Sequence, residues 1–222
     1  MLKEYFSSVS VEIYPLHTNE YAELIATGVD GLTIYQETYD EQLYSKLHLK
    51  GPKSDYHFRL DAPQRAAEAR MRQLNIGALL GLSEFRKEVF LIGLHAYWLQ
   101  QQFPGAEIGV SLPRIQPQIG NFSPEYPLSD RDLAQALIAT RIFMPRAGIT
   151  ISTRENTLLR NNLIGLGVTR LSAGSRTEVG GYALLEKTEG QFEIADHSSV
   201  DQVRQMVYRK GYQPVFKDWQ GL

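Results

Sequence analysis

The sequence predicts an α/β protein, in which a parallel sheet curls into a (β/α) barrel with helices on its outer side. Short apolar stretches rich in β-branched residues alternate along the chain with segments of helical period. Apolar and polar residues alternate little within these stretches, as expected for strands that are covered on both faces. Polar residues follow the carboxyl end of every stretch, which is where a barrel carries its active site.

The first three strand–helix units have clear boundary signals. Gly28 stops the first helix, and Asp61 as a cap with Pro63 in the first turn begins the second. The third strand, IGALLGL, runs directly into a long helix. The strands are predicted at residues 9–16, 29–35 and 76–82, and the helices at 18–26, 62–74 and 83–103.

The last three units are shorter, and a tail follows them. Ser129 is a favourable cap for the helix after the fourth strand. The strands are predicted at residues 107–112, 149–152 and 168–172, and the helices at 129–144, 158–166 and 199–210. An open doubly wound sheet and a barrel both fit this alternation. Only a barrel brings all strand ends to one point, so an incomplete barrel with about six of the eight units is favoured.

The composition excludes several classes of protein. The chain has 222 residues, 43% of them hydrophobic, and its formal charge of −2 gives no electrostatic footprint for nucleic acid or an anionic membrane. No apolar run can span a bilayer and the N-terminus is no signal peptide, so a cytoplasmic location is expected. The chain has no cysteine, and its histidines lack metal-ligand spacing, so no protein-only metal site is expected.

The strand ends suit the binding of a zwitterionic small molecule. Arginines there can clamp a carboxylate, and glutamates can accept hydrogen bonds. The set comprises Arg59, Arg114, Arg154, Glu12, Glu37, Glu84 and Glu155. No lysine ends a strand, and no Ser–His–Asp order, GxGxxG or GxxxxGK[ST] motif occurs, so the set contains no evident catalytic engine.

Most of these residues also have an ordinary structural explanation. Arg59 can form a salt bridge at the start of its helix, and Arg114 can be a loop residue. The basic turn at residues 47–53 can be a solvated loop. Only Gln36–Thr38 and Ser152–Glu155 favour a functional role from their strand-end position alone.

An ordered series of motifs resembles 2-iminoacetate synthase of the ThiH type, the radical-SAM tyrosine lyase of thiamine thiazole biosynthesis. The series is GLTIYQETY, RLDAPQRAAEA, IGALLGLSE, VSLPRIQP, STRENTLLR, SAGSRTEVGGY and QPVFKDW, and it runs from about Val9 to the C-terminus. No single motif is diagnostic, but their order is specific. The resemblance implies a radical-SAM-type barrel with a C-terminal helix and tail.

Two motifs imply contacts with the cofactor S-adenosylmethionine (SAM). The segment from Gly77 to Glu84 is similar to the G-x-[IVL]-x-G-x-x-E strand shared with biotin synthase, which packs on the adenine. Arg59 is similar to the arginine that meets the SAM carboxylate. The whole cofactor-binding set implied by the resemblance is Glu12, Gln36, Glu37, Thr38, Arg59, Ala78, Leu79, Leu80 and Glu84.

The resemblance also implies a substrate site for L-tyrosine. In related lyases a strand-end arginine and a following serine hold the α-carboxylate and the amine, and Arg154 and Ser172 match them here, with Ser175 as the second serine. The implied reaction breaks the Cα–Cβ bond of tyrosine, giving 2-iminoacetate (dehydroglycine) and 4-cresol, with 5′-deoxyadenosine and methionine from SAM.

The absence of cysteine is a large departure from the family. Its [4Fe-4S] cluster is held by a CxxxCxxC motif in the N-terminal part of the barrel, and this chain has no cluster ligand. The chain is therefore interpreted as the C-terminal portion of the enzyme, from about the third strand onward. Residues 1–182 are expected to form the partial barrel and 183–222 an extension packed on it.

Alone, the chain is predicted to be inactive and to need a partner. The expected partners are the missing N-terminal half and the thiazole synthase, besides the small molecules tyrosine and SAM. An apolar inner face with two unpaired sheet edges would make the isolated chain associate. The alternatives are a non-catalytic barrel that binds SAM or an amino acid, a regulatory remnant, or one half of a split enzyme. The related tyrosine lyase of hydrogenase maturation is disfavoured, because it carries further cysteines in a C-terminal cluster domain.

Overall fold

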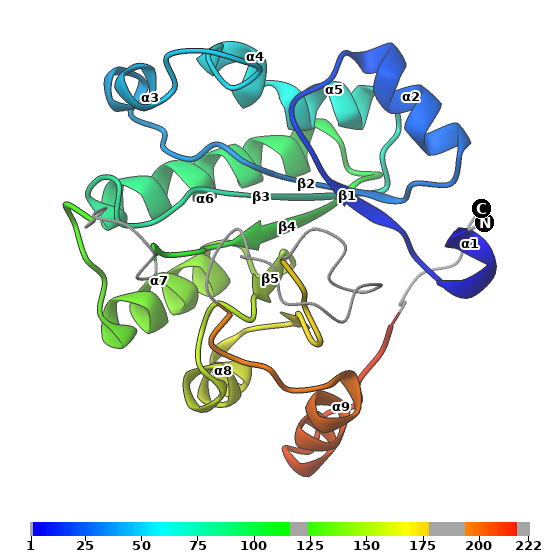
Figure 1. Ribbon diagram of the computed structural model, residues 1–222, viewed down its shortest axis with the longest axis vertical. Coiled ribbons are helices and arrows are strands. Elements are labelled where there is room, and N and C mark those ends of the chain that lie inside the picture. Colours follow the sequence, from blue (N-terminus) through cyan, green and yellow to red (C-terminus); the bar gives the residue numbers. More distant parts are fainter. Residues whose placement is uncertain (1, 116–123, 178–193, 217–222) are drawn as a thin grey trace.

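The structure, a computed structural model, describes residues 2–115, 124–177 and 194–216 (Figure 1). Its sheet contains six parallel strands in the order of the chain. They are β1 (Ser10–Glu12), β2 (Gly31–Tyr35), β3 (Gln73–Gly77), β4 (Glu107–Ser111), β5 (Gly148–Ile151) and β6 (Arg170–Leu171). The helices are α1 (Leu2–Tyr5), α2 (Thr18–Ala26), α3 (Glu41–Leu47), α4 (Tyr56–Leu60), α5 (Ala62–Glu68), α6 (Phe85–Gln102), α7 (Asp130–Phe143), α8 (Thr157–Leu163) with the 3-10 turn η1 (Ile164–Leu166), and α9 (Val200–Arg209).

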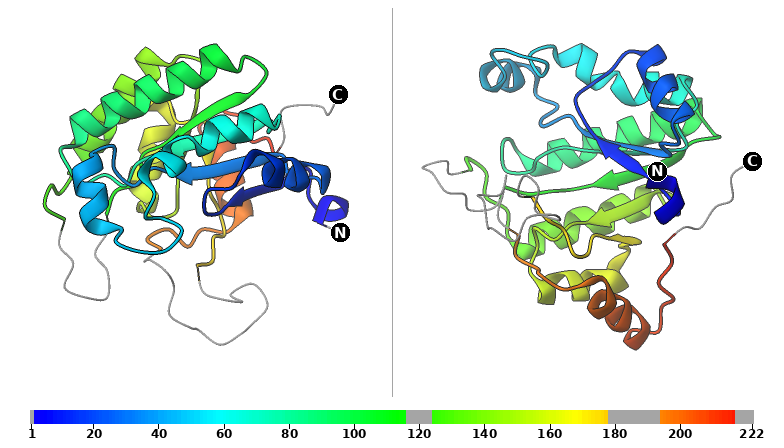
Figure 2. Two further views of the ribbon diagram at one scale, coloured as in Figure 1. Left: turned by 90° about the horizontal axis from the view of Figure 1, so that it is seen from above. Right: turned by 45° about the vertical axis from the view of Figure 1, so that its right-hand side comes forward.

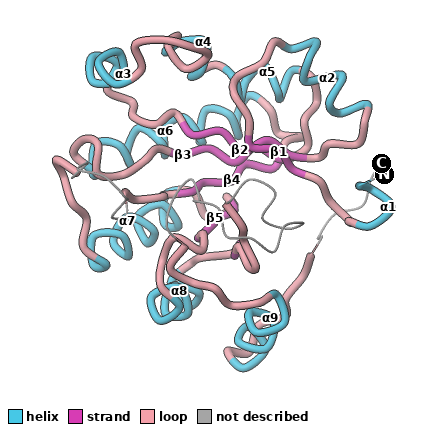
Figure 3. Tube along the Cα trace, viewed as in Figure 1, coloured by secondary structure: helices cyan, strands magenta, loops and turns pink. Residues whose placement is uncertain are grey.

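The strand order confirms the incomplete barrel. Each strand pairs with the next one in the chain, whereas a doubly wound sheet reverses its order at a switch point. The sheet curls, and the helices that connect its strands lie along its outer side (Figures 2 and 3). The carboxyl ends of all the strands therefore lie at the same end of the curl, which is called the mouth below.

The two faces of the sheet differ in chemistry. On the outer face, apolar strand residues such as Leu32, Ile76 and Val110 are buried against the helices. The inner face carries the alternate residues, which the register places side by side. They are mostly polar or glycine: Ser10, Glu12, Gly31, Thr33, Tyr35, Gln73, Asn75, Gly77, Glu107, Gly109, Ser111, Gly148, Thr150 and Arg170. The expected apolar inner face was therefore wrong, because the strands alternate in the way of a sheet with one wet face.

The boundary between α5 and β3 differs from the predicted one. The helix was expected to continue to Leu74 and the strand to begin at Ile76, but α5 ends at Glu68. Arg70 then adopts a left-handed conformation with φ of 71°, which stops the helix without a glycine. The strand can therefore begin at Gln73 and end at Gly77, before most of the GALLGLSE motif.

The sequence interpretation also missed two short helices between β2 and α5. Asp40 caps α3 by accepting a hydrogen bond from Leu43 N, and Asp55 caps α4 in the same way from Phe58 N. Both helices are shorter than the window in which helical periodicity is visible. None of the described helices has the length and hydropathy of a membrane span.

The described part of the C-terminal segment packs on the barrel. Arg160 of α8 forms a buried ion pair with Asp196, and Thr153 O accepts hydrogen bonds from Ala195 N and Asp196 N. Helix α9 adds a small apolar cluster in which Val203 meets η1. The predicted domain boundary at 182/183 lies outside the described residues, as does the end of the tail from residue 217.

Candidate functional site

The mouth of the sheet brings four polar side chains together from three strands. Glu12 and Tyr35 end β1 and β2, Glu37 follows β2, and Arg154 lies just beyond β5. Arg154 and Glu37 both act electrostatically on Glu12, and Tyr35, Glu12 and Glu37 act on Arg154. This is the convergence that the barrel prediction required of the strand ends.

Desolvation sets the protonation behaviour of this group. Partial burial raises the pKa of Glu12, although the opposite charge of Arg154 counteracts it. Burial likewise lowers the pKa of Arg154 against the pull of Tyr35 and Glu12. Burial raises the pKa of Tyr35 to about 12, so its phenol stays protonated at neutral pH. A partly desolvated guanidinium gains more from a ligand carboxylate than one in open water, since the local dielectric is lower.

Glu37 is the most constrained residue of the site. Its φ of 72° is unusual for a residue with a side chain, and such strain collects at functional sites. Its Oε1 accepts from Lys53 Nζ at 2.6 Å and from Arg59 Nη2 at 3.2 Å. Its carbonyl oxygen accepts from Leu79 N at 2.8 Å. One residue thus ties the basic turn, α4 and the GALLGLSE loop to the end of β2.

Arg59 is buried next to the Glu37 carboxylate. It is 5% exposed, and its Nε donates to Tyr35 O at 2.7 Å. Its Nη1 is buried with no hydrogen-bond partner among the described residues. The salt bridge that sequence allowed for Arg59 is therefore present, with Glu37 as its partner. A direct contact with a cofactor carboxylate stays a prediction.

Gln36 and Thr38 face the helices behind the sheet. Gln36 is 5% exposed and contacts Tyr56 O, and Thr38 is fully buried and donates to Glu88 Oε1 at 2.6 Å. Of the predicted trio, only Glu37 retains some exposure. The contacts explain this, because Gln36 and Thr38 bond to groups behind the sheet, while the Glu37 carboxylate accepts from Lys53 and Arg59.

The GALLGLSE motif forms the loop between β3 and α6. Leu79 is half-buried, while Ala78 and Leu80 are buried. Glu84 is exposed and caps α6, accepting from Arg86 N and Lys87 N. Desolvation opposes them, but together with Arg86 these two N–H groups lower the pKa of Glu84. Helix capping is thus the role that the structure assigns to Glu84, and contact of this loop with SAM stays a prediction.

Ser172 and Ser175 follow β6, on the same side of the mouth as Arg154. Ser172 N donates to Ile151 O at 3.2 Å, which places it beside the end of β5. Its carbonyl accepts from Arg160, so the buried ion pair of α8 also fixes this backbone. Ser175 comes after Gly174, whose φ of 61° turns the chain. Their predicted role in holding the substrate amine stays a prediction.

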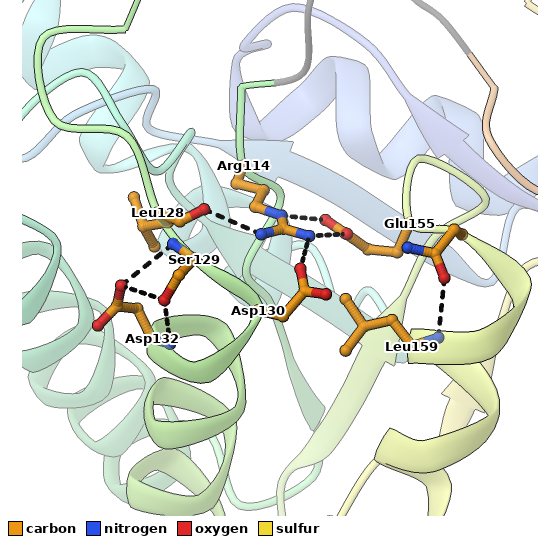
Figure 4. A network of polar contacts seen from close by, with 8 residues as sticks. Arg114, Leu128, Ser129, Asp130, Asp132, Glu155 and Leu159 are labelled. Carbon is orange, nitrogen blue, oxygen red and sulfur yellow. Dashed lines mark hydrogen bonds and ion pairs between the residues drawn. The ribbon is translucent and has the colours of Figure 1, made fainter.

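Arg114 joins two loops at the mouth instead of facing it as a free clamp (Figure 4). Its Nε and Nη2 contact Glu155 at 2.9 and 2.5 Å, and Nη1 donates to Leu128 O at 2.9 Å. Nη2 also meets Asp130 at 2.6 Å. The explanation of Arg114 as a loop residue is therefore correct. Its ion pair holds Glu155, which directly follows Arg154 in the chain.

Sequence reasoning missed three residues at this site. Tyr35 was predicted only as the end of a strand, Lys53 was assigned to a solvated turn, and Glu88 was given no role. A strict two-residue alternation through Thr33 and Tyr35 would have placed the phenol on the inner face. Lys53 had no local signal, because its ammonium contacts Glu37, which lies 16 positions away in the sequence. The buried Tyr44 OH also donates to the Lys53 carbonyl at 2.5 Å.

Comparison with known proteins shows which proteins the chain resembles. Residues 111–213 match the Biotin and Thiamin Synthesis associated domain. Over 219 residues, or 98% of this chain, it is 39% identical to 2-iminoacetate synthase of Escherichia coli and 36% identical to that of Salmonella typhimurium. The chain is homologous to the C-terminal portion of 2-iminoacetate synthase. It spans 58% of the length of each of these relatives.

Solved structures agree with this homology. The chain superposes on HydG, a maturase of the [FeFe]-hydrogenase, with a TM-score of 0.86 at 32% identity. The match covers 95% of this chain and 46% of HydG. HydG from Carboxydothermus hydrogenoformans gives 0.84 at 35% identity, covering 94% of this chain and 48% of that one. Methylornithine synthase (PylB) supports the fold alone. It is 19% identical, with a TM-score of 0.64 over 94% of this chain and 59% of its own.

The residues of this chain fit SAM, one of the two cofactors implied by the resemblance, but not the [4Fe-4S] cluster. The carboxylates of Glu12 and Glu37, with the buried Nη1 of Arg59 that is unpartnered among the described residues, suit the amino-acid part of SAM, which carries both an ammonium and a carboxylate. A [4Fe-4S] cluster does not fit, because the sequence has no cysteine. Within the described ranges, no group of three acidic or histidine side chains is arranged to hold a metal ion.

Proposed function

We propose that this chain is the substrate-holding, C-terminal part of a cytoplasmic radical-SAM lyase. The whole enzyme cleaves the Cα–Cβ bond of L-tyrosine to 2-iminoacetate and 4-cresol for thiamine thiazole synthesis. The observation that carries the proposal is the position of Arg154, which meets Glu12, Tyr35 and Glu37 at the mouth of a sheet homologous to that of 2-iminoacetate synthase.

Arg154 binds the substrate carboxylate in this proposal. A guanidinium presents two parallel N–H donors to a carboxylate, which fixes the orientation of the amino acid as well as its position. Ser172, with Ser175 as the second candidate, accepts from or donates to the substrate amine. The acidic pair Glu12 and Glu37 adds a negative potential that attracts the ammonium group of either ligand.

SAM lies against Glu37 and the loop that follows β3. With its cluster, SAM would supply the radical chemistry that begins at a hydrogen atom of the substrate amine. The residues of this chain contribute orientation, because they hold the amine at a defined distance from the adenosyl group. The buried Arg59 supports this arrangement through its bond to Glu37.

The chain alone is inactive in this proposal, since no residue of it can bind the cluster that reduces SAM. The N-terminal part of the barrel, which carries the cluster ligands, completes the enzyme, and the thiazole synthase receives the product. The same lack of cysteine favours a second candidate, a non-catalytic barrel that binds SAM or an amino acid.

Calorimetric titration with L-tyrosine tests the substrate site. The wild-type chain should bind tyrosine, and Arg154→Ala should abolish the binding heat. Arg146→Ala is the matched control, because Arg146 is exposed at the opposite end of β5. No binding by the folded wild-type chain, or equal binding by Arg154→Ala, would refute the substrate site.

A second experiment separates the lyase from the binding protein. The chain is mixed with a cysteine-bearing N-terminal half of 2-iminoacetate synthase carrying a reconstituted cluster, and 4-cresol is measured. Production of 4-cresol by the mixture alone supports the lyase. Tyrosine binding without any 4-cresol favours the non-catalytic barrel.

A further inference from the structure

We propose that Glu88 is a positioning residue that holds the two SAM-binding loops in a single arrangement. These are the β2 loop, residues 36–40, and the β3 loop, residues 78–84. The inference rests on the proposed function, because it assigns a role to a residue behind the same site.

The carboxylate of Glu88 contacts both loops at once. Glu88 is 1% exposed and lies in the first turn of α6. Its Oε1 accepts from Thr38 Oγ1 at 2.6 Å and from Ser83 Oγ at 2.8 Å, and its Oε2 accepts from Tyr39 N at 2.9 Å. Thr38 and Tyr39 belong to the β2 loop and Ser83 to the β3 loop, so a single side chain bridges them.

The bridge extends to the residues that face the ligand. Thr38 Oγ1 also accepts from Asp40 N at 3.1 Å, which connects Glu88 to the cap of α3. Glu37 lies next to Thr38, and Leu79 N donates to its carbonyl at 2.8 Å. The two loops are therefore joined at the front by a backbone bond and at the back by the carboxylate. Moving either loop breaks both connections.

A packing role alone does not require a carboxylate at this position. Burial of a carboxylate costs free energy, and an apolar residue of similar length would fill the same space without that cost. What the carboxylate adds is direction, because it accepts three hydrogen bonds at fixed positions and donates none. It thereby defines where the backbone on either side of Glu37 and Leu79 lies.

Two variants of Glu88 distinguish positioning from packing. Glu88→Met keeps the length and removes every acceptor. Glu88→Gln keeps one acceptor for Tyr39 N, while its amide can donate to the hydroxyls of Thr38 and Ser83. The control is Ile92→Val, one turn further along α6, which removes a buried methyl group and no hydrogen-bond acceptor.

The first measurement is hydrogen exchange followed by mass spectrometry on the unliganded chain. In Glu88→Met, exchange should accelerate in the β2 loop and the β3 loop together, and stay unchanged at residues 152–156. The exchange rates of the two loops in Glu88→Gln should lie between those of Glu88→Met and those of the wild type. Acceleration in neither loop, or an equal acceleration in Ile92→Val, would overturn the inference.

The second measurement is calorimetric titration with SAM and with L-tyrosine. Glu88→Met should bind SAM about tenfold more weakly, the effect of one lost hydrogen bond on loop position. Its tyrosine affinity should fall less than its SAM affinity, because Arg154, the proposed carboxylate clamp, lies on a different strand end. Unchanged SAM affinity in a folded Glu88→Met, or equal loss for both ligands, would refute the role while leaving the site intact. A wild-type chain that binds neither ligand would remove the proposed function and this inference together.

Discussion

Arg114 and Glu155 form a bidentate ion pair that fastens the loop after β4 to the loop after β5, with Nε–Oε1 and Nη2–Oε2 distances of 2.9 and 2.5 Å (Figure 4). Both side chains are largely buried, at 11% and 4% exposure. Glu155 follows Arg154 directly, so the pair holds the backbone that presents the proposed substrate clamp.

Removal of Glu155 should destabilise the fold. Glu155→Ala leaves a buried guanidinium with its remaining partners Asp130 and Leu128 O, and we expect the free energy of unfolding to fall by about 3 kcal/mol. Asp130→Ala removes the partner that is 59% exposed and should cost less than about 1 kcal/mol. Urea denaturation of the three proteins checks this, and equal losses in the two variants would contradict it.

Gly77 should not tolerate a side chain. A Cβ at this position would lie 2.0 Å from Ser111 O on the neighbouring strand, so β3 and β4 would have to separate. We expect Gly77→Ala to lower the free energy of unfolding by about 1–3 kcal/mol or more. Gly105→Ala is the control, because a Cβ there meets nothing within 4 Å. Similar melting temperatures for the two variants would show that the strands can yield.

Arg70 should be improved by glycine. Its φ of 71° strains a residue with a side chain, and the residue is exposed after the end of α5. Arg70→Gly should raise the free energy of unfolding by about 0.5–1 kcal/mol. Gln101→Gly, in the right-handed helix α6, should instead lower it by about 1 kcal/mol. Thermal and urea unfolding measure both, and a loss of stability in Arg70→Gly would argue against the strain.

His95 should make the fold sensitive to mild acid. Burial lowers its pKa from 6.5 to about 4, and its Nδ1 lies 2.8 Å from Tyr39 OH. The folded chain therefore binds fewer protons than the unfolded chain between these values. The stabilisation is complete above pH 6.5 and is lost as the pH falls toward 4, by up to about 3 kcal/mol.

The variant His95→Gln isolates this contribution from that of the carboxylates. Urea unfolding at a series of pH values should show a shallower fall in stability for His95→Gln than for the wild type. His57→Gln is the control, since the His57 side chain is 70% exposed. Parallel curves for wild type and His95→Gln would exclude His95 as the source.

Much of the fold was predictable from local patterns. The helix at 18–26 has the predicted bounds, and Ser129 caps α7 with the reciprocal bond from Asp132, as its residue type indicates. The α5–β3 boundary was not predictable, because Arg70 takes a conformation for which its residue type gives no signal. The chemistry of the inner face was missed because short strands make a two-residue alternation hard to separate from a continuous apolar run.

The candidate site was predictable only where strand position decides it. Glu12, Glu37 and Arg154 follow from their places at strand ends, and the structure brings them together. The burial of Thr38 against Glu88 and of Arg59 beneath Glu37 depends on how helices pack on the sheet. Such contacts join residues up to 50 positions apart, and no local pattern encodes them.

The polar inner face also determines the hydration of the mouth. A trough lined by hydroxyls, amides and charges holds water by hydrogen bonds, so an arriving amino acid exchanges one set of polar partners for another. Little apolar area would leave water where the charged head group of an amino acid docks, so that group would contribute little to the heat capacity of binding. Selectivity for the head group would come from the direction of a few donors and acceptors.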